Sequence, residues 1–65
     1  MWAEFTRTKN GFVAEVLQEL LNAEGMSVRV MPPVSGPASP GWLDERVVYL
    51  PTGKHHVAQE ILRRV

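Results

Sequence analysis

The residues best suited to chemistry stand together late in the chain, at Thr52, Gly53, Lys54, His55 and His56. A glycine turn that opens a helix presents free backbone amides and the positive end of the helix dipole, which together can hold an anion. The lysine and the two histidines would add positive charge. The segment therefore predicts a site for a phosphate-bearing small molecule. The alternative is that Thr52 caps the helix while the charged side chains are only solvated.

The spacing within this segment excludes two more specific sites. A nucleotide-binding phosphate loop needs a glycine five positions before Gly53, where Val48 stands, and a serine or threonine after Lys54. Adjacent helical residues point about 100° apart, so His55 and His56 are badly placed to share a metal ion. His56 and Glu60 have the i, i+4 spacing of a surface pair. We expect no metal and no other cofactor.

Catalytic patterns are equally weak. The chain has no cysteine, and none of Ser27, Ser35 and Ser39 lies in a Gly-x-Ser-x-Gly turn. Asp44 and Glu45 are adjacent before a strand, where successive side chains face opposite ways. A chain of 65 residues also has little material to enclose a water-excluding pocket. We expect a protein that is not an enzyme.

Length and charge limit the remaining classes. The 65 residues suit a single domain, 1–65, and seven basic residues balance seven acidic ones. That balance lacks the electrostatic footprint of a nucleic-acid-binding protein. The longest wholly apolar run, Val47 to Leu50, is far shorter than the roughly 20 residues needed to cross a bilayer. We expect a cytoplasmic protein that binds neither nucleic acid nor membranes.

Two stretches have the spacing of amphipathic helices. The first covers residues 11–24, with Asn10 as its N-cap and Gly25 as the residue that ends it. Its apolar stripe consists of Val13, Val16, Leu17, Leu20 and Leu21. The second covers residues 53–64, after Thr52. Its stripe consists of Val57, Ala58, Ile61, Leu62 and Val65.

Three stretches have the character of strands, at residues 2–8, 26–31 and 46–50. The second alternates apolar and polar residues, as in a strand with one buried face. The third is apolar on both faces, which suits a central strand. Residues 32–45 hold four of the five prolines and are predicted to form a loop.

This order of elements, β-α-β-β-α, predicts an α+β fold of the ferredoxin-like kind, a two-layer sandwich without its final strand. Because the third strand is the most apolar, we place it in the middle, which makes the strand order 1-3-2 with both helices on one face. The other face is left to Trp2, Met31, Val47 and Tyr49. An uncovered apolar face is a candidate contact surface.

Three segments carry a family resemblance: residues 10–26, whose key feature is the helix end Leu20-Leu21-Asn22-Ala23-Glu24-Gly25, then Ser27–Val30, and Val48-Tyr49-Leu50-Pro51 before the last helix. With a strand at the start of the chain, they resemble the short bacterial domains described as signal-transducing proteins of unknown function. Those domains are similar in shape to the trunk of P-II regulatory proteins. The resemblance implies a regulatory role and no catalytic residues.

The loop offers the other candidate site. A 14-residue connection, 32–45, is long for a compact domain, and such loops are often functional. Its prolines lower the entropy lost on docking, and tryptophan is enriched in binding hot spots. We therefore predict partner binding through Pro37, Pro40 and Trp42 of the loop, or through Tyr49 of the uncovered sheet face. The alternative for Trp42 is that it folds back over a small core.

Two functions follow from these patterns. The first is a regulatory or protein-interaction module that binds another protein, or a second copy through an edge strand, by way of the loop or the uncovered sheet face. The alternative is a P-II-like sensor of a phosphate-bearing small molecule at the start of the last helix.

Overall fold

The structure, a computed structural model, describes residues 1–36 and 39–64. Pro37 and Val65, which the sequence places in the loop site and in the last helical stripe, lie outside the described residues. The elements in chain order are β1 (Trp2–Thr8), α1 (Gly11–Ala23), β2 (Arg29–Met31), β3 (Arg46–Pro51) and α2 (His55–Arg63).

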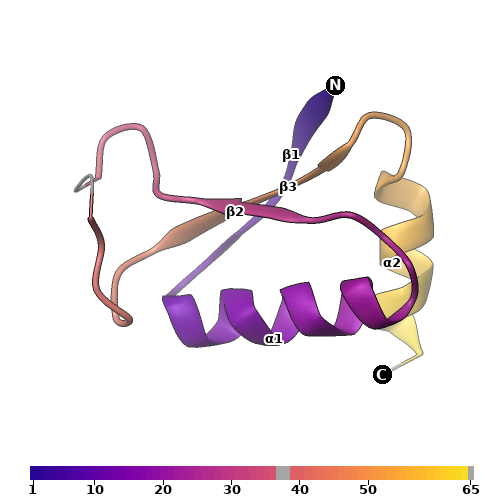
Figure 1. Cartoon of the computed structure of the whole chain (residues 1–65), viewed down its shortest axis with the longest axis horizontal. Helices are drawn as coiled ribbons and strands as arrows, with labels where there is room; N and C mark the ends of the chain where they lie inside the picture. The colour runs from indigo at the N-terminus through magenta and orange to yellow at the C-terminus, as the bar shows by residue number, and fades with distance from the viewer. Residues whose placement is uncertain (37–38, 65) are drawn as a thin grey trace.

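The three strands form one antiparallel sheet in the order β1-β3-β2. Figure 1 shows α1 running along one face of this sheet, with α2 at the end where α1 finishes and the long loop at the opposite end. The predicted α+β class and strand order are therefore confirmed.

The helix bounds follow from local capping. The Asn10 side chain accepts a 3.0 Å hydrogen bond from the backbone amide of Val13, which begins α1 as predicted. Gly25 adopts a φ of 85°, a conformation that residues with a Cβ rarely adopt, and its amide bonds to the Asn22 carbonyl. α1 therefore ends where the sequence indicated.

The core joins the sheet to both helices. Its buried cluster contains one residue of α1, one of β3 and two of α2: Leu21, Leu50, Ala58 and Ile61. Phe5, Met26, Val28 and Leu62 pack against this cluster. Since Leu50 meets residues of both helices, α1 and α2 lie on the same face of the sheet.

The helix stripe expected from the sequence is rotated in the structure. Val13 and Val16 are about half exposed, at 44% and 54%, whereas Ala14 and Leu21 are buried. The apolar residues of α1 occupy a wider part of the helix surface than the three-stranded sheet covers. One apolar flank of α1 therefore faces solvent.

Two elements are shorter than predicted. β2 covers only residues 29–31 of the expected 26–31, since these three alone pair with β3, while Met26 still bonds to the Leu21 carbonyl of α1. α2 covers residues 55–63 of the expected 53–64, after a turn in which Gly53 has a φ of 91°.

The second face of the sheet mixes aromatic and charged side chains. Tyr49 pairs in register with Glu4 of β1 and Arg29 of β2, so these three share the face opposite Leu50. The Arg29 guanidinium lies 4.8 Å above the Trp2 ring. Trp2, Met31, Val47 and Tyr49 share this face as predicted, although Val47 itself is buried.

In the described part of the chain, neither helix is long and apolar enough to cross a membrane.

Candidate functional site

Arg46 organises the second half of the loop. Its guanidinium donates to the carbonyl of Asp44 at 2.7 Å and to that of Gly41 at 2.8 Å. Longer bonds reach the carbonyls of Glu45, at 3.3 Å, and Pro40, at 3.4 Å. A planar guanidinium has five donors in a fixed arrangement, so one side chain can hold several carbonyls at once. Residues 40–45 are therefore a folded segment.

A turn and a bond to α1 complete this arrangement. The Gly41 amide donates to the Asp44 carboxylate at 2.8 Å, and the Asp44 amide donates back to the Gly41 carbonyl at 3.1 Å. The Gly11 amide, the first of α1, donates to the Trp42 carbonyl at 2.7 Å. This last bond uses an amide that has no partner within the helix. The loop is thereby attached to the start of α1.

Trp42 stacks on Phe12 of α1. Their ring centroids are 4.9 Å apart with an interplanar angle of 22°, and the two side chains are 54% and 53% exposed. Val16 lies one helical turn beyond Phe12, and Leu43 follows Trp42 with 82% of its surface exposed. We call Phe12, Val16, Trp42 and Leu43 the Trp42 surface. Half of the tryptophan is thus left to solvent, which differs from the alternative in which it folds back over the core.

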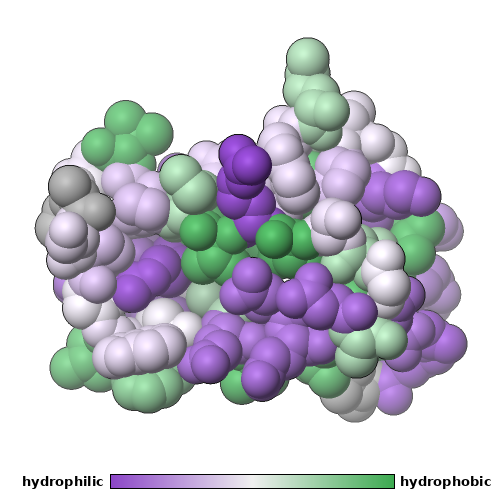
Figure 2. Space-filling view, viewed as in Figure 1, coloured by the Kyte–Doolittle hydropathy of each residue, from purple (hydrophilic) through white to green (hydrophobic). Residues whose placement is uncertain are grey.

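A hollow lies beside Trp42, between α1 and the outer strand β2. It has a volume of about 250 Å³ and is lined by Gly11, Ala14, Glu15, Gln18, Val30, Trp42 and Arg46. Figure 2 shows apolar side chains at the centre of this side of the molecule, above a row of hydrophilic side chains along α1. Ala14, Val30 and Trp42 supply the apolar part of the lining of the hollow, and Glu15, Gln18 and Arg46 supply its polar part.

The structure separates the residues that were predicted to bind a partner. Pro40 is half-buried and accepts a bond from Arg46, and Trp42 lies on the α1 side of the sheet. Tyr49 lies on the opposite face of the sheet, in register with Glu4 and Arg29. Trp42 and Tyr49 therefore belong to two different surfaces.

The start of α2 is tied to β1. The Thr52 amide and hydroxyl both donate to the Met1 carbonyl, at 2.8 Å and 3.1 Å. The sequence suggested Thr52 as the cap of α2, but its hydroxyl bonds to Met1 instead and does not cap the helix. The N-cap position is Lys54, which makes no capping bond with its side chain.

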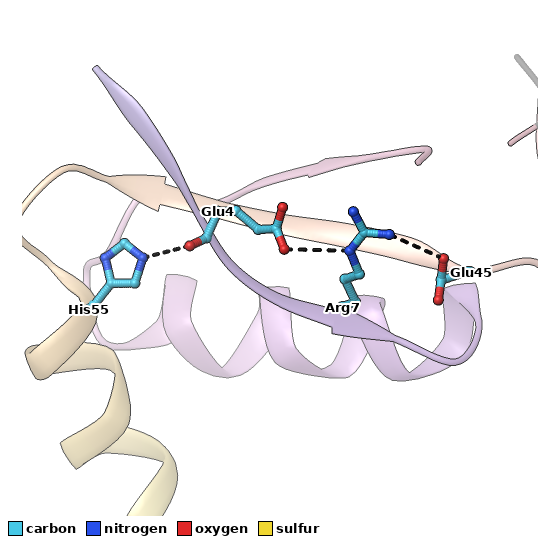
Figure 3. A network of polar contacts seen from close by, with 4 residues as sticks. All are labelled: Glu4, Arg7, Glu45 and His55. Atoms are coloured by element: carbon cyan, nitrogen blue, oxygen red, sulfur yellow. Dashed lines mark hydrogen bonds and ion pairs between the residues drawn. The ribbon is translucent and has the colours of Figure 1, made fainter. Parts of the chain in front are cut away.

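His55 makes a second link between the same two elements. Its Nε2 donates to the Glu4 carbonyl at 2.8 Å, and its ring meets the Phe5 ring edge-on at 5.7 Å (Figure 3). Arg7 lies further along β1, 3.4 Å from the Glu4 carboxylate and 3.7 Å from that of Glu45. The His55 side chain is thus used in holding α2 against β1.

Among the predicted anion-binding residues, Lys54 lines a hollow of about 250 Å³ at the junction of the two helices. The other lining residues are Glu24, Gly25, Met26, Ser27, Pro51 and Val57. Gly53 and His56 are exposed, and Glu60 pairs with Arg63 at 3.5 Å. Within residues 1–36 and 39–64, no three His, Asp or Glu side chains gather as a metal site would require.

Comparison of the chain with protein-family models, curated proteins and solved structures finds no match in any of the three. The resemblance to signal-transducing domains with a P-II-like trunk therefore stays a prediction. The fold defines the chain as a small α+β protein with an antiparallel sheet in the order 1-3-2.

Three residues of the Trp42 region were not singled out from the sequence. Phe12 lies outside the apolar stripe that was assigned to the core. A helical projection of residues 11–24 would have placed this phenylalanine beside the stripe, and a large apolar residue in that position is the signal that could have identified it. Arg46 gave a weaker signal, which is its position as a basic residue between two acidic residues and the apolar run of the third strand. Gly11 gave none, because its role depends on a contact with the distant Trp42.

Proposed function

We propose that this chain is a non-enzymatic regulatory or protein-interaction module that binds a protein partner through the Trp42 surface. The observation that carries the proposal is the half-exposed Trp42–Phe12 stack on a loop held by Arg46 and Gly11. A pre-ordered aromatic side chain loses little conformational entropy on binding. Such residues dominate the energetics of many interfaces.

The surroundings of the stack support the same role. Val16, one helical turn from Phe12, and Leu43, next to Trp42 in the chain, are further exposed apolar side chains. Contiguous apolar patches on a small domain mark contact surfaces more often than isolated apolar residues do. The aromatic and charged face around Trp2 and Tyr49 gives weaker support, because Arg29 already lies over the Trp2 ring.

Site-specific photo-crosslinking in a lysate of the source organism tests the proposal. A photoreactive residue at position 43, which is 82% exposed, should capture one defined protein or a second copy of the chain. The same residue at position 34, fully exposed in the same loop, is the matched control and should not capture it. Trp42→Ala should reduce the yield from position 43 by about tenfold or more, as expected for a binding hot spot. Equal capture from both positions, or a yield insensitive to Trp42→Ala, would contradict the proposal.

A sensor of phosphate-bearing small molecules is the second candidate, and the hollow beside Lys54 is the observation that favours it. Glu24 lines the same hollow, and Thr52 and His55 are bonded to β1, so the geometry supports this candidate less. An amide NMR titration with phosphate and with adenine nucleotides tests it. Saturable shifts at Gly53 to His56 with sub-millimolar ligand would replace the interaction role with the sensor.

A further inference from the structure

β2 is the outermost strand on its side of the sheet, so its second edge has no partner strand among the described residues. Unpaired amides and carbonyls on such an edge can pair with an added strand. The hollow between β2 and α1 lies against this strand, since Val30 forms one of its walls. A strand added to β2 would direct every second side chain toward α1 and the hollow.

The size and lining of the hollow suit a side chain better than a free small molecule. Its volume of about 250 Å³ lies below the roughly 300–1,000 Å³ of typical small-molecule pockets. Ala14, Val30 and the Trp42 ring provide apolar walls for one aliphatic or aromatic side chain. An added strand would supply that side chain at its central position.

The charge on the helix rim indicates what flanks this side chain. Glu15 lines the hollow, Glu19 lies one turn further along α1, and the helix contains no lysine or arginine. Neither glutamate makes an ion pair with another described residue. Arg46 lies at one end of the hollow, but its donors are directed at four backbone carbonyls of its own loop. The rim therefore favours a basic side chain on the incoming strand.

The same charges argue against a second copy of this chain in the groove. Two β2 edges paired about a two-fold axis would bring the α1 helices of both copies side by side. Glu15 and Glu19 of each helix would then face the same residues of the other. Like charges in such close positions lower the stability of the pairing.

We propose that the groove between β2 and α1 binds an extended segment of a protein partner by strand addition. The segment places an apolar side chain in the hollow and a lysine or arginine beside Glu15 and Glu19. This inference rests on the proposed interaction function and assigns the chemistry of the partner. Trp42 belongs both to the Trp42 surface, where it stacks on Phe12, and to the lining of the hollow.

Two matched peptides test the groove directly. In both peptides threonine occupies every second position, which faces away from α1, and valine occupies the central position that faces the hollow. The remaining positions that face α1 are lysine in the first peptide and glutamate in its control. In an amide NMR titration, the lysine peptide should cause saturable shifts at Ala14, Gln18 and Val30. We expect its affinity to exceed that of the glutamate peptide by about tenfold, from two partly exposed charge pairs. Equal affinities, or no saturable shift at Val30 and Gln18 with the lysine peptide, would overturn the proposal.

A charge reversal on the protein provides the second arm. Glu15→Lys should abolish the preference between the two peptides, because the new positive charge offsets Glu19, whereas Glu60→Lys, an equal change of charge on an exposed position of α2, should leave the preference unaltered. Both positions are exposed, so both variants should fold. An unchanged preference in Glu15→Lys would overturn the assignment of charge.

The outcome also separates this inference from the function on which it rests. A crosslinked partner that shifts Phe12 and Leu43 without shifting Val30 and Gln18 would refute strand addition and keep the Trp42 surface. Peptide binding in the groove combined with crosslinking insensitive to Trp42→Ala would refute the Trp42 surface as the site of interaction.

Discussion

Gly11 and Trp42 are in such close contact that no other residue type fits at position 11 without movement. The Gly11 amide bonds to the Trp42 carbonyl at 2.7 Å, and a Cβ on Gly11 would lie 2.9 Å from Cε3 of the tryptophan ring. Real Cβ atoms essentially never come so close to another heavy atom. The missing side chain of Gly11 thus lets the loop dock on the first turn of α1.

Gly11→Ala should therefore separate the Trp42 and Phe12 rings. The cost of overpacking exceeds the gain in helix propensity, so we expect a net loss of about 1 kcal/mol of unfolding free energy. The indole amide proton and the Phe12 ring protons should shift in an NMR spectrum. Gly41→Ala is the control, because its Cβ would meet only the Asp44 carboxylate at an ordinary 3.7 Å. Unchanged Phe12 ring shifts in Gly11→Ala would contradict the role assigned to this contact.

Arg46→Lys should loosen the loop while keeping the charge. An ammonium group cannot reproduce a planar guanidinium that reaches four carbonyls, so we expect a loss of about 1–3 kcal/mol of unfolding free energy. Hydrogen exchange at the amides of Gly41 and Asp44 should accelerate. Arg7→Lys, which alters only exposed ion pairs, should cost less than about 1 kcal/mol. Equal exchange rates in the wild type and Arg46→Lys would show that the guanidinium does not organise the loop.

The two histidines should differ strongly in their effect on stability. His55→Ala removes the bond to the Glu4 carbonyl and the edge contact with Phe5, which together predict a loss of about 1–2 kcal/mol. His56→Ala, at an exposed neighbouring position, should change the unfolding free energy by less than about 0.5 kcal/mol. Urea unfolding of the two variants at one fixed pH measures both losses. Similar values for the two variants would argue against the link between α2 and β1.

Leu21 and Val16 both belong to the apolar stripe seen in the sequence, yet only Leu21 is buried. Leu21→Ala should cost about 2–5 kcal/mol, because it opens a cavity among Leu50, Ala58 and Ile61. Val16→Ala should change the unfolding free energy by about 0.5 kcal/mol or less. Urea denaturation of the two variants gives the comparison directly. A large loss in Val16→Ala would mean that this flank of α1 is covered in solution.

Much of the fold could be predicted from local patterns. Asn10 and Gly25 mark the ends of α1 through interactions that involve only nearby backbone, so their roles are readable from residue type alone. Val47, Val48 and Leu50 are buried on both faces of β3, as an apolar run at a central strand indicates. The strand order followed from that one inference.

The candidate site was harder to predict, because its contacts join distant residues. Trp42 could be chosen as a tryptophan in a long loop, but its stacking partner Phe12 lies thirty positions earlier in the chain. Thr52 had the residue type of an N-cap, yet the Met1 carbonyl, at the other end of the chain, takes its hydroxyl hydrogen bond instead. Local propensity does not include such competing partners.

The sequence by itself determined the α+β class, the position of the two helices and the central place of β3, because the period of apolar residues is a local property of the chain. Only the tertiary structure decided which flank of α1 faces solvent, and that Arg46 and Gly11 hold the loop so that Trp42 rests on Phe12 half-exposed. It also decided that Trp42 and Tyr49 lie on different surfaces. These outcomes depend on the width of the sheet, the strand register and steric contact between segments far apart in sequence, which no local pattern contains.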